Sequence, residues 1–304
     1  MSPTTWPRKG RWQVTLKATL VSRDKLRSMN TRTNLPALLA IGLWGTLAPI
    51  GSLLSDLPPF FLTGVGLLVG STLAWFMGLK PRHALTIPPQ TLLVGIFGLF
   101  GYHAALFTAL QTAPAVQANL VNYLWPLLIV LLAPVFIKGA SLTVRHVIAG
   151  LIGFLGAALA ITSAGEIAGD GSWGYFFALL AAVIWASYSL LTKRLPRFPT
   201  AFVGVFGFVS GCLSLIAHLL LEQPVSPSTF EWALLVVMGL GPLGGAFYLW
   251  DYAIKNGDPQ RIGLMSFLTP LLSTTLLLLV TGKALTLQLL LAGVLIVGAA
   301  LLGN

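Results

Sequence analysis

Apolar residues form ten long stretches along the chain, and short connections that contain most of the charged residues separate them. A helix needs about 20 consecutive apolar residues to cross the hydrocarbon core of a bilayer. The pattern therefore predicts an all-α integral membrane protein with ten transmembrane helices, near residues 35–54, 59–79, 91–110, 116–136, 144–163, 173–192, 200–221, 232–254, 262–281 and 286–302.

Polar and aromatic residues recur inside several of these spans at positions i, i+3, i+4 and i+7, which share one face of a helix. In a membrane such side chains face other helices or a water-filled cavity. We expect these stripes to converge on one central cavity: Asn119, Asn122, Tyr123 and Pro126; Ser266, Thr269, Pro270 and Ser273; Trp185, Tyr188, Ser189 and Thr192; Tyr248, Asp251, Tyr252 and Lys255; and Tyr102, His103, Thr108 and Gln111.

Two prolines stand in the middle of their spans. Pro126 cannot donate a hydrogen bond to the carbonyl of Asn122, and Pro270 is expected to leave the carbonyl of Ser266 free. A free carbonyl is tolerated at membrane depth only beside a cavity. The aromatic faces of Tyr123 and Trp125, next to the first proline, suit a cationic ammonium group. We expect both prolines to act as hinges.

Three segments of the first half resemble segments of the second half in the same order. They are "ALLAIGLWGT" (37–46) with "ALLAAVIWAS" (178–187), "NYLWPLL" (122–128) with "SFLTPLL" (266–272), and "LTVRHVIAG" (142–150) with "LTLQLLLAG" (285–293). Each half, 34–163 and 173–303, holds five predicted spans, and because five is odd the second half enters the membrane inverted. Inverted repeats around a central cavity are typical of secondary transporters, although channels and membrane enzymes can also be duplicated.

Composition excludes several other classes of protein. Of the 304 residues, 56% are hydrophobic and 9% charged, and the mean hydropathy is +0.86, so lipid must solvate most of the apolar surface. The single cysteine, Cys212, excludes a disulfide framework. The sequence has no nucleotide-binding, zinc-protease or hydrolase motif, and we expect no cofactor and no metal.

The net charge of +10 is distributed by side of the membrane, which argues against a nucleic-acid partner. With both termini in the cytoplasm, the cytoplasmic loops receive nearly all Lys and Arg, as the positive-inside rule requires. The opposite side receives Lys283 and the acids Asp56, Glu166, Asp170, Glu222 and Glu231. Residues 1–33 form a basic cytoplasmic tail, which we expect to be disordered beside anionic headgroups. Met29 is an alternative start.

The arrangement of ten spans in two halves, with Trp44 in the first span, resembles the drug/metabolite transporter superfamily. The segments "FTALQTAPAVQANLVNYLWP" (107–126) and "LWDYAIKNGDPQRIGLMSFLTPLLS" (249–273) resemble its EamA-type amino-acid exporters in particular. The resemblance implies a monomeric, multi-pass protein of the bacterial inner membrane. It would export small-molecule substrates, namely amino acids with aromatic ones among them, by alternating access.

Candidate substrate-binding residues combine the polar stripes with this resemblance: Trp44, Tyr102, His103, Asn122, Tyr123, Trp125, Trp185, Tyr188, Tyr248 and Ser266. Trp44 could equally pack between the repeats. His103 could bond substrate or carry a coupled proton, so proton-coupled efflux of other metabolites or drugs is an alternative. A membrane-embedded enzyme is a remote alternative, since no convincing catalytic pair is present. For Asp251 and Lys255, one helical turn apart, we expect a local ion pair.

Overall fold

Helices make up the regular structure of the chain throughout the part that the computed structural model describes, residues 32–163 and 172–303. Within that part, nine helices are long and apolar enough to cross a membrane, and Leu287–Leu302 is a shorter apolar helix. The prediction of an all-α membrane protein is confirmed, and the helices match the predicted spans within a few residues. The nine are Arg32–Leu53, Pro59–Phe76, Pro89–Thr112, Ala115–Phe136, Val144–Thr162, Trp173–Arg194, Thr200–Leu221, Thr229–Asn256 and Pro259–Val280.

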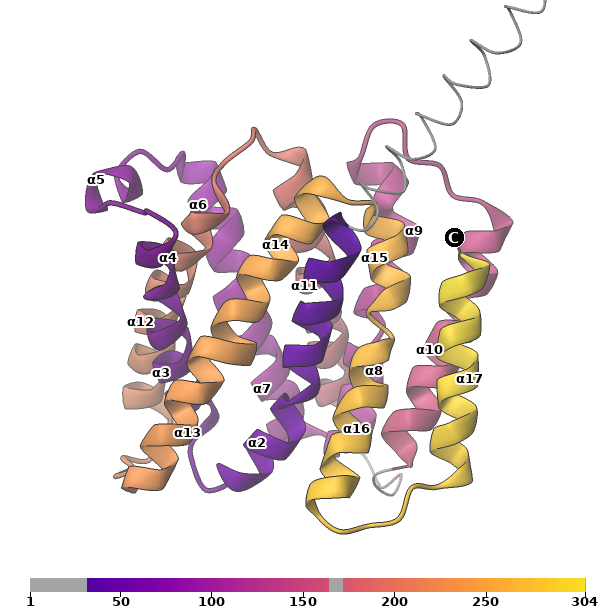
Figure 1. Cartoon of the computed structure of the whole chain (residues 1–304). Coiled ribbons are helices and arrows are strands. Elements are labelled where there is room, and N and C mark those ends of the chain that lie inside the picture. Colours follow the sequence, from indigo (N-terminus) through magenta and orange to yellow (C-terminus); the bar gives the residue numbers. More distant parts are fainter. Residues whose placement is uncertain (1–31, 164–171, 304) are drawn as a thin grey trace, which may run out of the picture.

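The two halves of the chain run through the bundle in opposite directions. The first half begins at the top of Figure 1 and ends at the bottom with α10 (Val144–Thr162). The second half begins at the bottom with α11 (Ser172–Arg194) and ends at the top with α17 (Leu287–Leu302). Each half thus contributes five helices with opposite orientation, as the odd number of spans predicts.

The third and eighth spans each contain a π-helical segment. In the third span η1 (Phe97–Gly101) lies between α6 (Pro89–Ile96) and α7 (Tyr102–Thr112). In the eighth, η3 (Gly241–Gly245) lies between α13 (Thr229–Leu240) and α14 (Ala246–Asn256). The two segments are separated along the chain by the same distance as Pro126 and Pro270, so they occupy equivalent positions in the repeats. Single π turns within helices are frequent at functional sites.

The fourth and ninth spans are broken at equivalent places. The fourth consists of α8 (Ala115–Asn122) and α9 (Trp125–Phe136), and the ninth of α15 (Pro259–Met265) and α16 (Leu268–Val280). The predicted free carbonyl of Ser266 is wrong: this oxygen accepts from the backbone N–H of Thr269 at 3.0 Å, because the chain tightens by one residue at the break.

The remaining helices complete the two halves. The first span ends in α2 (Leu47–Leu53), the second span is α3 (Pro59–Ser71) followed by α4 (Leu73–Phe76), and a short α5 (Pro81–Ala84) precedes the third. The seventh span starts with η2 (Thr200–Phe202) and continues as α12 (Val203–Leu221). Glycines let helices pack closely at two places. A Cβ on Gly98 would lie 2.2 Å from the ring of Tyr188, and one on Gly153 would lie 2.4 Å from Phe267.

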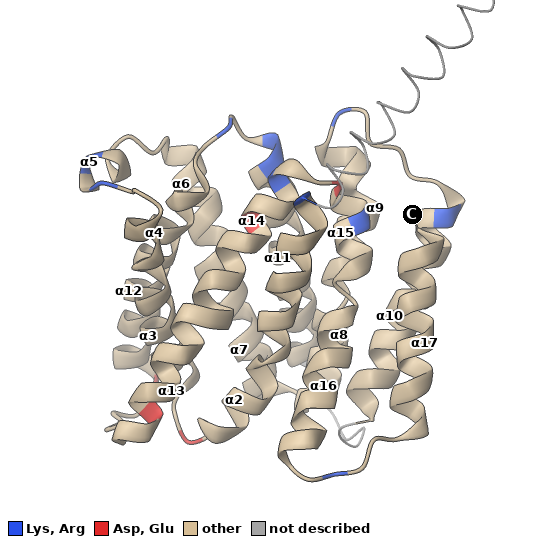
Figure 2. Cartoon of the chain, viewed as in Figure 1, with Lys and Arg blue, Asp and Glu red and all other residues tan. Residues whose placement is uncertain are grey.

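The two ends of the bundle differ in charge, and we call them the basic end and the acidic end. Lys and Arg gather at the end where α9 and α14 finish, while the opposite end shows one basic position beside acidic ones (Figure 2). Glu222, at the acidic end, accepts from the backbone N–H groups of Phe60 (2.9 Å) and Phe61 (3.2 Å) and pairs with His218 at 2.9 Å. Glu166, Asp170 and residues 1–31, including Met29, lie outside the described residues.

Candidate functional site

A cavity of about 730 Å³ extends from the acidic end to the middle of the bundle. At its inner end a small chamber of about 70 Å³ continues it. The cavity's mouth lies between the end of the first span and the starts of α3 and α8, where Ser55, Pro59 and Ala115 line it. The chamber is lined by Trp44, Leu47, Tyr102, His103, Asn122, Tyr123, Trp125, Trp185, Leu243, Phe247 and Thr269.

Seven of the ten predicted binding residues therefore meet at one place, although they come from the first, third, fourth and sixth spans. No Asp, Glu, Lys or Arg stands among the described residues that line the cavity or the chamber. His103 is the one lining side chain there that could carry a positive charge. Such an environment suits a neutral or zwitterionic solute better than an ion with a net charge.

Four tryptophans close the chamber toward the basic end. The ring of Trp44 lies 5.7 Å from Trp185 and 5.1 Å from Trp250, and Trp125 lies 5.6 Å from Trp250. Edge-to-face and tilted pairs at these distances each contribute about 0.5–1.5 kcal/mol beyond their buried area. Trp250 also donates from Nε1 to the hydroxyl of Ser189 at 3.0 Å. We call these four side chains the tryptophan layer.

Trp44 lies both on the chamber wall and at the contact between the two repeats. Its ring lines the chamber, and its Nε1 donates to the carbonyl of Pro242 at 3.1 Å. Pro242 lies in η3 of the second half. The first span is therefore tied to the π-helical segment of the opposite repeat at the level of the chamber.

Hydrogen bonds fix the orientation of His103. Its Nδ1 lies 2.7 Å from the carbonyl oxygen of Leu99. A carbonyl can only accept, so Nδ1 must carry the hydrogen, and in the neutral ring Nε2 is then a free acceptor. The histidine is thus held by its own helix and offers its second nitrogen to a partner.

Asn122 offers a second acceptor. Its Nδ2 donates to the hydroxyl of Tyr102 at 3.3 Å, while its Oδ1 is buried and has no hydrogen-bond partner. The hydroxyl oxygen of Thr269, also on the chamber wall, is likewise buried and unpartnered. Buried polar atoms without a partner cost about 1–3 kcal/mol each, so a solute with N–H donors would gain by binding here.

Tyr188, Tyr248 and Ser266 do not line the chamber. Tyr188 packs against Trp185 with ring centroids 5.3 Å apart. The hydroxyl of Tyr248 donates to the carbonyl of Gly70 at 3.2 Å, and Ser266 donates to the carbonyl of Ile262 at 2.8 Å. These three side chains support the walls, and no part of the structure assigns them a substrate contact.

The prediction that the polar stripe of the eighth span lines the central cavity is wrong. Tyr252 and Lys255, together with Thr192 of the sixth span, line a different pocket at the basic end. The expected ion pair is present, with 2.6 Å between Lys255 Nζ and Asp251 Oδ2. Periodicity identifies the face of a helix but not the depth at which a residue lies, so residues of one stripe can serve two cavities.

The residues Leu47, Leu243 and Phe247 line the chamber, and Trp250 packs behind it; none of the four was predicted. Phe247 and Trp250 lie on α14 one or two positions away from polar residues of the stripe, and their aromatic character beside "LWDYA" was the available signal. Among the described residues, no group of three or more His, Cys, Asp or Glu side chains could hold a metal ion.

Two inverted five-helix repeats, broken helices at the centre, and an uncharged cavity that opens at one end define a multi-pass membrane transporter. The chain matches the EamA-like transporter family over residues 32–162 and 172–304, and it belongs to that family.

Two known proteins that resemble this chain carry the same description. The chain is 40% identical to "Aromatic amino acid exporter YddG" from Ancylobacter novellus, over 86% of this chain and 93% of that protein. It is 27% identical to the protein of the same name from Escherichia coli K12, over 81% and 87%. A solved structure titled "Crystal structure of protein" has 38% identity and a TM-score of 0.84, over 90% of this chain and 97% of that one.

Proposed function

We propose that the chain exports amino acids, aromatic ones among them, across the bacterial inner membrane by alternating access. The observation that supports this most directly is the chamber, which combines aromatic walls, no Asp, Glu, Lys or Arg among its described lining residues, and two buried oxygens without a partner, Asn122 Oδ1 and the Thr269 hydroxyl. The names of the relatives in Ancylobacter novellus and Escherichia coli support the same substrate class. The complete chamber lies within one chain, which supports a monomer as the functional unit.

Each group of an amino acid has a complement in the chamber. The ammonium group would donate to Oδ1 of Asn122 and Nε2 of His103 and lie against an indole face, a contact worth about 0.5–2 kcal/mol when desolvated. The carboxylate would accept from the Tyr123 hydroxyl. An aromatic side chain would pack among Trp44, Trp125 and Phe247, where ring contacts replace water.

The charge of the two ends supports the orientation. With the basic end in the cytoplasm, as the positive-inside rule favours, the cavity faces the periplasm and the tryptophan layer closes the cytoplasmic side. In the other state of the transport cycle, the mouth of the cavity would close. The side chains of the tryptophan layer would separate and open the chamber to the cytoplasm. The breaks before Pro126 and Pro270 are the places where α9 and α16 can change direction with the smallest loss of hydrogen bonds.

Transport into liposomes tests this function. Purified protein reconstituted in liposomes should take up labelled phenylalanine and tryptophan faster than empty liposomes do, and unlabelled aromatic amino acids should compete. Phenethylamine and 3-phenylpropanoate, each lacking one of the two charges, should compete less well. If no amino acid moves while another metabolite does, the alternative of efflux of other small molecules replaces this proposal.

A further inference from the structure

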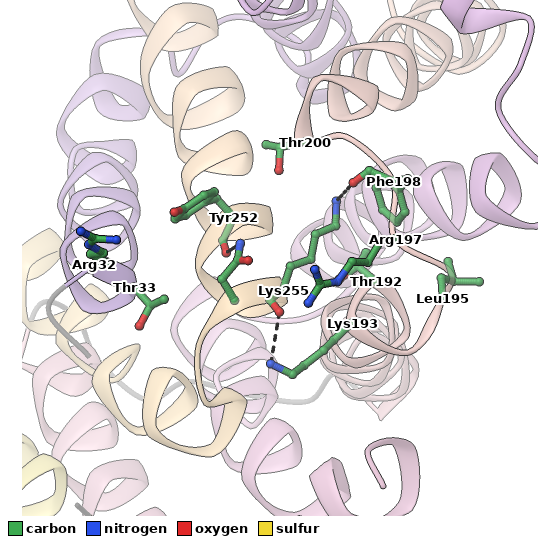
Figure 3. A pocket seen from close by; sticks show the side chains of 11 residues that line it. Arg32, Thr33, Thr192, Lys193, Leu195, Arg197, Phe198, Thr200, Tyr252 and Lys255 are labelled. Carbon is green, nitrogen blue, oxygen red and sulfur yellow. Dashed lines mark hydrogen bonds between the residues drawn. The ribbon is translucent and has the colours of Figure 1, made fainter. Parts of the chain in front are cut away.

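A second pocket, of about 720 Å³, lies at the basic end. Its walls are the last turn of α11, the connection that follows α11, and the last turns of α14; Figure 3 shows Arg32 and Tyr252 on one side and Lys193 and Arg197 on the other. Lys255 is the fourth cationic side chain of the wall. We call this space the basic pocket.

The basic pocket lies directly behind the tryptophan layer. Trp185 lines the central chamber and Thr192 lines the basic pocket. Both belong to α11, and seven residues of helix span about 10 Å. Between them Ser189 accepts from Trp250 and, through its carbonyl, from the hydroxyl of Thr192. A solute that leaves the chamber along α11 toward the basic end would therefore meet the basic pocket.

Both lysines of the pocket already make polar contacts within the protein. Only Lys255 forms a salt bridge with a described residue. Lys255 pairs with Asp251, donates to the carbonyl of Phe198 at 3.2 Å, and lies 3.3 Å from the centre of the Phe198 ring. Lys193 donates to the backbone carbonyls of Ile254 (3.2 Å), Lys255 and Gly257 at the end of α14. Its ammonium group therefore lies against carbonyl dipoles, and the carboxylate of Asp258 also acts on its charge.

The guanidinium groups of Arg32 and Arg197 make no hydrogen bond and no ion pair with another described residue. Each guanidinium has five N–H donors in a planar fork that fits a carboxylate. The carboxylate of Asp258 is exposed and caps α15 by accepting from the backbone N–H of Gln260 at 3.0 Å. With Lys255 neutralised by Asp251, the pocket retains an excess of positive charge from Arg32, Lys193 and Arg197.

Aromatic surface accompanies this charge. The ring of Phe198 forms part of the wall, and Tyr252, 43% exposed, lines the pocket from the side of Arg32 (Figure 3). A carboxylate with an aromatic side chain would therefore find both a guanidinium and a ring within one space. A phosphate group of a lipid would use the charge but not the rings.

We propose that the basic pocket binds the carboxylate of the amino-acid substrate before the tryptophan layer opens, with Arg197 as the principal donor. The proposal rests on the proposed function. The site adds to the central chamber, which holds no positively charged lysine or arginine. The substrate carboxylate would enter at the basic end. The positive charges of Lys193 and Arg32 would attract it to Arg197.

Calorimetric titration of 3-phenylpropanoate into the protein in phosphatidylcholine nanodiscs tests the pocket, since this probe has the carboxylate and the ring but no ammonium. Arg197→Gln should raise the Kd of the probe at least about ten-fold, because it removes a charge-assisted bidentate contact. The matched control Arg82→Gln, an exposed arginine on α5 at the same end, should change the Kd by less than about two-fold. Equal binding by wild type and Arg197→Gln overturns the proposal.

Two further measurements distinguish a substrate carboxylate from a lipid phosphate, and the basic pocket from the proposed transport function. Trp125→Ala should keep probe binding although it impairs transport, and phenylalanine but not phenethylamine should displace the probe. If nanodiscs with phosphatidylglycerol block the probe while phenylalanine does not displace it, the pocket is a lipid headgroup site and the proposal fails. If wild-type protein transports phenylalanine but Arg197→Gln binds the probe as well as wild type does, the basic-pocket proposal is wrong and the proposed function is unaffected.

Discussion

Trp125 has contacts of two kinds. It lines the chamber on one side and packs against Trp44 and Trp250 on the other, with centroid distances of 6.3 and 5.6 Å. The same ring would therefore bind substrate and close the basic end. Removing it changes affinity and the closed state together, whereas removing a tryptophan on the lipid-facing surface should change neither.

We expect Trp125→Ala to weaken phenylalanine transport while folded protein remains in the membrane. Loss of one stacking and cation–π partner costs about 1–2 kcal/mol, which corresponds to roughly ten-fold in apparent affinity. The matched control is Trp173→Ala, because Trp173 is 74% exposed at the start of the sixth span. Uptake kinetics in liposomes measure both. Normal transport by Trp125→Ala at normal expression would remove the support for the chamber.

His103→Gln should lower transport without changing its response to a proton gradient. The structure holds His103 by a bond to Leu99 and shows no carboxylate among the residues that line the chamber, so the histidine is better suited to bond substrate than to relay protons. The measurement is phenylalanine uptake with and without an imposed pH gradient. Wild-type flux that follows the gradient, and loses this response in His103→Gln, would favour proton-coupled efflux.

At this scale the sequence predicted which residues meet but not all of their contacts. Asn122, His103 and Trp185 were identified because polar and amphipathic side chains are costly in lipid and must face the interior. Tyr248 and Ser266 obey the same rule, yet they bond to backbone carbonyls of Gly70 and Ile262 instead. An inward-facing side chain can form its hydrogen bond with the backbone of a neighbouring helix, as Tyr248 does, or with its own helix, as Ser266 does. Periodicity does not distinguish either case from lining a cavity.

At the scale of the helices, the breaks in the fourth and ninth spans are the features most directly connected with movement. α8 ends at Asn122 and α9 begins at Trp125, and the equivalent break follows Met265. Proline lacks a backbone N–H and therefore weakens a helix wherever it stands in the sequence. For this reason both breaks could be predicted from the positions of Pro126 and Pro270. The π-helical segments η1 and η3 were not predicted, since one extra residue in a turn leaves no periodic signature.

Pro126→Ala should slow transport several-fold with little change in KM. Alanine restores an N–H that can donate to the carbonyl of Asn122, so α8 and α9 can join into a stiffer helix. The control is Pro134→Ala, which restores an N–H in the interior of α9, away from the break. Initial rates over a range of phenylalanine concentrations separate kcat from KM. Equal rates for Pro126→Ala and wild type would exclude this hinge.

The whole molecule has one open end and one closed end. The sequence could not predict which, because the state depends on a few contacts such as those of Trp250 and Lys193 with neighbouring helices. It did predict the inverted halves and the separation of charge, since both follow from the number and order of spans. The predicted boundaries of the halves at 34–163 and 173–303 stay predictions.

Cysteine labelling tests the orientation of the whole bundle. In a Cys212→Ser background, Asp56→Cys and Lys283→Cys should react with an impermeant maleimide from outside intact cells. Arg82→Cys and Lys138→Cys should react only after the cells are opened. All four positions are exposed, whereas Glu222 is unsuitable because it caps α3. The reverse labelling would place the basic end outside, so that the cavity would face the cytoplasm and the proposed orientation would be wrong.

The absence of fixed charge along the described cavity wall has a consequence for the source of energy. A zwitterionic amino acid that crosses with a neutral protein moves no net charge through the electric field of the membrane. The membrane potential supplies about 2.3 kcal/mol for each elementary charge per 100 mV, and here that charge is zero. If no ion is coupled to this movement, electrical work contributes nothing to the proposed export, and the cell's own excess of the amino acid would set the direction and the limit of the flux.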